Sequence, residues 1–102
     1  MDRNRNTNRN GRQFDSETVQ KVWDKCSFVP GRGGETHRYD ACGIIIYRYS
    51  YGQETEMGWE IDHIKPVAKE GSDNLSNLQA LQARLNAKKG DTYPWTCPKL
   101  KI

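Results

Sequence analysis

Apolar positions near the start of the chain recur with the period of a helix. Val19, Val22, Trp23 and Cys26 are spaced by three and four residues, which places them on one face of a helix predicted over about residues 16–26. Asp15 stands just before this stretch, where a side-chain oxygen caps the first backbone N–H groups. The sequence therefore predicts an amphipathic helix that begins after Asp15.

The middle of the chain has the composition of strands. Residues 42–51 and 57–64 are rich in β-branched and aromatic side chains, and we expect them to pair as a hairpin with a long loop. Pro66 ends the second strand because proline has no N–H for the ladder. Residues 27–40 contain one proline and three glycines, which predicts a loop.

A second helix is expected near the C-terminal end, where leucines recur at helical spacing. Asn77 and Asn86 are nine residues apart, and at about 100° per residue they would lie on opposite faces of one straight helix. We therefore expect Asn77 in the preceding turn and the helix to start near Leu81. Gly90 is suited to end it.

Composition limits the protein to one small domain with a thin core. The chain has 102 residues and a mean hydropathy of −0.98, and no apolar run is long enough to cross a membrane. Residues 1–13 contain four arginines and no apolar residue after Met1, so we expect a disordered basic tail before a single domain over residues 14–102, with its core motif at about 42–91.

The three cysteines form no C-x-x-C pair. An odd number argues against a disulfide framework, and the spacing argues against a structural zinc site. No secretory signal is visible either. We therefore expect free thiols, no structural zinc and a cytoplasmic location.

Charge is unevenly distributed around a net value of +3. The basic residues of the folded part are concentrated after residue 62, as a polyanionic substrate would require. Chance surface charge is the alternative interpretation.

One stretch carries candidate chemistry. His63 can accept a proton from water near neutral pH, so it is the candidate general base. Asp62 and Asn86 offer hard oxygen ligands that suit Mg²⁺ first, with Mn²⁺ as the alternative. Asn77 would orient the His63 ring or fix the connecting loop. Candidates for phosphate or DNA contact are Lys89, Lys88 and Arg38. Taken singly, each of these residues also has an ordinary structural interpretation.

The joint spacing of these residues resembles the HNH endonuclease signature. The segments that carry it are Glu60-Ile61-Asp62-His63-Ile64-x-Pro66, Gly71-x-Asp73-x-Leu75-x-Asn77-Leu78-Gln79 and Asn86-x-x-Lys89-Gly90. The resemblance implies an α+β protein with the small ββα-metal fold, a β-hairpin plus a metal-site helix, here with an additional N-terminal helix. It implies His63 as the base, Asp62 and Asn86 as the ligands of one divalent ion, and Asn77 as the middle asparagine. Many members place histidine at the position of Asn86, and many carry zinc-binding cysteine pairs that this chain lacks.

The expected function is that of a metal-dependent endonuclease acting on DNA, with RNA not excluded. A single site in a monomer or weak dimer favours nicking or cutting of low sequence specificity. The alternative is a nucleic-acid-binding or adaptor module that keeps the fold without turnover. A purely structural metal-binding domain is disfavoured by the lack of clustered cysteine and histidine.

Overall fold

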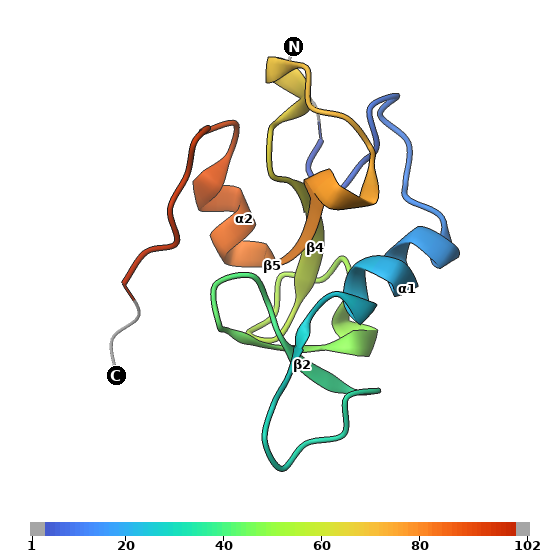
Figure 1. Ribbon diagram of the computed structural model, residues 1–102, viewed down its shortest axis with the longest axis vertical. Helices are drawn as coiled ribbons and strands as arrows, with labels where there is room; N and C mark the ends of the chain where they lie inside the picture. The colour runs from blue at the N-terminus through green and yellow to red at the C-terminus, as the bar shows by residue number, and fades with distance from the viewer. Residues whose placement is uncertain (1–3, 100–102) are drawn as a thin grey trace.

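The computed structural model describes residues 4–99 as an α+β protein. In this part of the chain, two helices and two antiparallel sheets follow one another (Figure 1). The order is α1 (Ser16–Asp24), β1 (Ser27–Phe28), β2 (His37–Tyr39), β3 (Ile45–Tyr47), β4 (Trp59–His63), β5 (Leu78–Gln82) and α2 (Ala83–Lys89). Short 3₁₀ turns lie at Arg48–Ser50, Val67–Lys69 and Leu75–Asn77.

Helix α1 confirms the first prediction from the sequence. The Asp15 carboxylate accepts a hydrogen bond from the Thr18 N–H at 2.8 Å, which satisfies one of the free N–H groups of the first turn. Val19, Val22 and Trp23 are buried, and the Trp23 ring packs against Trp59 of β4 with centroids 5.4 Å apart. The helix thus anchors the strand that carries the candidate site.

Strand pairing differs from the prediction. β4 pairs with β5, from Trp59 opposite Gln82 to His63 opposite Leu78, whereas β3 pairs with β2. The predicted hairpin between residues 42–51 and 57–64 is therefore wrong. Leucines at 78, 81 and 85 match a helical period and predict a helix from about Leu81, but residues 78–82 form a strand because β4 needs a partner for its N–H and C=O groups. The secondary structure of this short apolar segment was therefore determined by its pairing with β4 and not by its own periodicity.

Strand β5 leads directly into helix α2, which lies beside β4 and β5 and apart from the three-stranded sheet (Figure 1). The helix begins within two residues of the expected start, and the Gly90 N–H bonds to the Asn86 carbonyl at its end. Order and pairing are compatible with an HNH-type domain. The main core joins α1 to both sheets through the buried residues Val19, Val22, Trp23, Ile46, Trp59, Ile61, Leu78 and Ala80.

The segment before α1 is not the disordered tail that its composition predicted. Residues 1–3 lie outside the described residues, but residues 4–13 fold against β4. The Asn6 side-chain oxygen accepts hydrogen bonds from the Ile61 N–H and the Tyr51 hydroxyl, each at 2.8 Å, and Thr7 bridges to Gln13. Polar side chains order this segment through hydrogen bonds, which a hydropathy argument does not capture.

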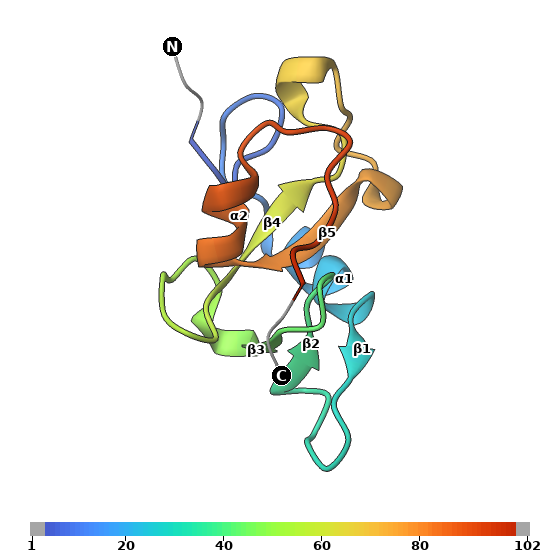
Figure 2. The same cartoon turned by 90° about the vertical axis from the view of Figure 1, so that its left-hand side faces the viewer.

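The expectation of free thiols is also corrected. Cys42 and Cys97 form a disulfide across 55 residues of sequence, so the segment after α2 is joined to the turn between β2 and β3 (Figure 2). Cys26 remains a free thiol, and burial raises its pKa to about 11. The argument for a cytoplasmic location from free thiols therefore fails. Among residues 4–99, no helix has the length and apolarity to span a membrane.

Candidate active site

Three of the predicted site residues come together at one open cavity of about 250 Å³. Asp62 and His63 reach it from the end of β4, and Asn86 reaches it from α2. The cavity is also lined by residues of the N-terminal segment, Asn4, Arg5 and Asn6. Residues distant in sequence therefore share one concave site, the usual setting of an active site.

Asp62 lies in a buried hydrogen-bonded environment on β4. Its Oδ1 lies 3.2 Å from the Lys89 Nζ and its Oδ2 accepts a hydrogen bond from Gln79 Nε2 at 2.9 Å. Burial raises the pKa of the Asp62 carboxyl, while the bonds from Gln79 and Lys89 act in the opposite direction. Each oxygen keeps a further lone pair, so the carboxylate can still act as a ligand.

Lys89 has a different position from the one proposed for phosphate contact. Its side chain is 2% exposed, and its Nζ also donates to the His63 carbonyl at 3.1 Å. Lys89 therefore ties α2 to the end of β4. Its neighbour Lys88 is exposed on the same helix, so Lys88 is the one of the two that solvent or a substrate can reach.

Asn86 is oriented by a carboxylate that the sequence reasoning did not select. Its Nδ2 donates to Glu60 Oε1 at 2.9 Å, which assigns the amide nitrogen to this contact and leaves the amide oxygen as a ligand atom. Arg5 Nε donates to the same Glu60 oxygen at 3.0 Å, and this bond raises the pKa of Arg5. Glu60 is two residues before Asp62, and side chains two apart share a strand face, so period-two spacing could have identified it.

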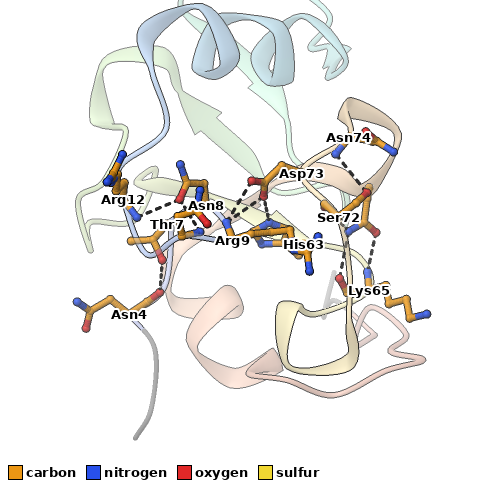
Figure 3. Close-up of polar contacts among 12 residues, drawn as sticks. Asn4, Thr7, Asn8, Arg9, Arg12, His63, Lys65, Ser72, Asp73 and Asn74 are labelled. Atoms are coloured by element: carbon orange, nitrogen blue, oxygen red, sulfur yellow. Dashed lines mark hydrogen bonds and ion pairs between the residues drawn. The ribbon is translucent and has the colours of Figure 1, made fainter.

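His63 is held by Asp73, from the connection between β4 and β5. Its Nε2 lies 2.7 Å from Asp73 Oδ1, and the ring packs against Phe14 with centroids 5.8 Å apart. The backbone N–H of Arg9 donates to both oxygens of Asp73, at 3.2 and 3.1 Å (Figure 3). Neither Asp73 nor Arg9 was selected from the sequence as a partner of the base, although Asp73 stands within the family signature.

Asn77 fixes the connecting loop, which is the second of its two predicted roles. Its side chain accepts from the Lys65 N–H at 2.9 Å and donates to the carbonyls of Lys65 and Ser72 at 3.1 and 2.8 Å. The loop closes tightly here, since a Cβ added at Gly71 would lie 1.7 Å from the Lys65 carbonyl oxygen. Among the described residues, the Asn77 side chain therefore contacts the loop backbone and not the His63 ring.

Arg38 is not brought to the cavity. Its guanidinium donates to the carbonyls of Gly34, Trp23, Asp24 and Cys26, three of which lie at or just beyond the end of α1. A cation that satisfies free carbonyls at a helix C-terminus stabilises the helix end. The structure therefore gives Arg38 a structural role distant from the site.

The donor set at the cavity suits a hard cation. Among residues 4–99, no group of three or more His, Cys, Asp and Glu side chains is placed to hold a metal ion. The Asp62 carboxylate and the Asn86 amide oxygen remain as two hard ligands lining one cavity. Mg²⁺ is commonly bound by one or two protein oxygens with water and phosphate completing its shell, so these two residues fit such an ion.

Comparison with known protein families agrees with this geometry. The family model for HNH endonucleases matches residues 53–95, which contain β4, β5, α2 and the loop between the two strands. The match covers less than half of the chain, so it shows that this segment is similar to HNH endonucleases, a family whose description indicates nuclease activity in general. No curated protein and no solved structure matches the chain.

Proposed function

We propose that this protein is a metal-dependent endonuclease that hydrolyses phosphodiester bonds in DNA. The observation that carries the proposal is the meeting of Asp62, His63 and Asn86 at one cavity, within the segment that matches the HNH family. A base and two hard oxygen ligands at a shared concave site are the parts that phosphodiester hydrolysis with a divalent ion requires.

Asp62 and Asn86 would hold the ion, with Mg²⁺ the first choice and Mn²⁺ the alternative. When bound, the ion supplies positive charge that neutralises the phosphate and stabilises the leaving oxygen. Asp62 would contribute negative charge to the ion from a buried position, and Glu60 keeps the Asn86 amide turned with its oxygen free. His63 accepts the proton of the attacking water.

DNA is the proposed substrate because the chain carries a net positive charge that is concentrated after residue 62. Arg5 lines the cavity and Lys88 is exposed on α2, so both can meet phosphate groups. A single site cuts one DNA strand at a time, which favours nicking. We also expect little sequence specificity. Monomer or weak dimer remains our expectation for the assembly.

The alternative is a nucleic-acid-binding module without turnover. The observation that favours it is the contact of Lys89 with Asp62, because an internal cation already occupies one oxygen of the proposed ligand. Under this alternative, a divalent metal ion does not bind at Asp62, and adding it does not cause cleavage of bound DNA.

Relaxation of supercoiled plasmid by the purified protein tests the proposal, with Mg²⁺, with Mn²⁺ and with EDTA. His63→Ala should lower the nicking rate by about 10²- to 10⁴-fold, the usual contribution of a general base, while DNA binding persists. His37→Ala is the matched control, since His37 packs against Tyr47 in the other sheet. Equal nicking by wild type and His63→Ala would exclude His63 as the base, and binding without any metal-dependent nicking would favour the alternative.

A further inference from the structure

We propose that Asp73 is the positioning residue of the base: its carboxylate holds the His63 ring with the proton on Nε2 and leaves Nδ1 to accept the proton from water. The inference rests on the proposed function and deepens it. It assigns a role that neither of the asparagines in the signature fulfils, since Asn77 contacts the loop backbone and Asn86 contacts Glu60.

The contact determines which ring nitrogen carries a hydrogen. Asp73 Oδ1 lies 2.7 Å from His63 Nε2, and an ionised carboxylate can only accept a hydrogen bond. Nε2 must therefore be the protonated nitrogen, and in the neutral ring Nδ1 carries the lone pair. A histidine in this state is ready to act as a base through Nδ1.

Nδ1 is also the nitrogen that is open to solvent. His63 is only 6% exposed, yet among the described residues no hydrogen-bond partner is found for Nδ1. Within the same residues, no fully buried side-chain nitrogen or oxygen lacks a partner. Nδ1 must therefore retain some contact with solvent, and His63 is one of the residues that line the open cavity.

Asp73 is itself held in place from two directions. The Arg9 N–H bonds to both of its oxygens, although the Asp73 side chain is 38% exposed and would otherwise sample several rotamers. Asn77 closes the same loop from the other side through Ser72 and Lys65. The N-terminal segment and the loop thus converge on one carboxylate (Figure 3).

The competing explanation is that Asp73 and His63 form a contact that only stabilises the loop. Such a contact would support folding, and its loss would lower stability without acting specifically on the rate of the chemical step. The two explanations differ in their kinetic and spectroscopic consequences, because a positioning residue acts through the base and a structural one does not.

The test combines Asp73→Asn with the matched control Glu70→Gln, which removes an exposed carboxylate from the same loop. We expect Asp73→Asn to lower kcat by about 10- to 100-fold, a range typical of partners that orient a functional histidine, with KM unchanged. Glu70→Gln should match wild type. In a His63→Ala background, Asp73→Asn should cause no further loss, because the two residues act as one unit.

Nuclear magnetic resonance of the metal-free, ¹⁵N-labelled protein shows directly which ring nitrogen of His63 carries a proton. We expect a slowly exchanging, downfield proton on His63 Nε2 in wild type and in Glu70→Gln, and its loss in Asp73→Asn. A proton on Nδ1 in wild type, or full cleavage by Asp73→Asn, would overturn the proposal. If wild type fails to cleave DNA with either metal, the proposed function fails, while the Nε2 proton still decides whether Asp73 sets the tautomer.

Discussion

Lys89 Nζ lies 3.2 Å from Asp62 Oδ1, and the two side chains are only 2% and 7% exposed. A buried ion pair costs desolvation when it forms, and removing one partner leaves an uncompensated charge in the interior. The contact joins α2 to β4 at the residue proposed to bind metal. It therefore connects the stability of the fold to the electrostatics of the site.

Lys89→Met should lower the free energy of unfolding by about 3 kcal/mol or more, because Asp62 would stay buried without its partner. Lys88→Met is the control and should change stability by less than about 0.5 kcal/mol, since Lys88 is exposed. Urea denaturation without metal measures both. Equal stability of the two variants would show that the ion pair does not hold the helix to the strand.

Asn77→Ala should lower the free energy of unfolding by about 1–3 kcal/mol, because its three hydrogen bonds to the backbone of Lys65 and Ser72 would be lost. Asn74→Ala provides the comparison, because Asn74 is an exposed asparagine in the same loop. Thermal or urea unfolding distinguishes the two variants. A neutral Asn77→Ala would contradict the loop-fixing role.

Gly71→Ala should disturb the same loop by steric conflict. The added Cβ would lie 1.7 Å from the Lys65 carbonyl oxygen, so the backbone must move. We expect a loss of stability together with weaker protection of the Ile64 N–H, which bonds to the Asn77 carbonyl. Hydrogen exchange measures that amide, and Gly33→Ala is the control because its Cβ meets only the Thr36 hydroxyl at 3.9 Å.

The disulfide predicts a defined number of reactive thiols. Unfolded protein should react with one equivalent of a thiol reagent before reduction and with three after it, since Cys26 is free and Cys42 is bonded to Cys97. Reduction should lower the free energy of unfolding by about 4 kcal/mol on the chain-entropy estimate for a loop of this length. Three equivalents without reductant would contradict the bond.

Stability should also fall at alkaline pH because of Cys26. Burial raises the pKa of this thiol from 9.0 to about 11, so the unfolded chain loses the proton first and becomes favoured as pH rises from about 9 to about 11. The contribution is of the order of 2 kcal/mol and is fully present below pH 9. Tyr51, whose pKa burial raises to about 12, acts in the same sense at higher pH. The difference between wild type and Cys26→Ser, measured by denaturation across this range, isolates the thiol.

Local patterns in the sequence were sufficient for the elements that depend on neighbouring residues. The cap at Asp15, the buried stripe of α1 and the end of α2 at Gly90 follow from side chains within a few positions of each other. The candidate site was also recognisable, because Asp62, His63 and Asn86 stand at the spacing of a known signature, and the structure places all three at one cavity.

Tertiary structure alone decided which distant groups satisfy one another. The pairing of β4 with β5, the bond between Cys42 and Cys97 and the docking of residues 4–13 all join segments whose separation in sequence carries no periodic signal. The same is true of the contact between Asp73 and His63 and of the contact between Lys89 and Asp62. Sequence by itself determined the reactive groups and the helices. Only the fold determined their partners, because a buried polar group requires a hydrogen-bond partner but does not specify where in the chain that partner lies.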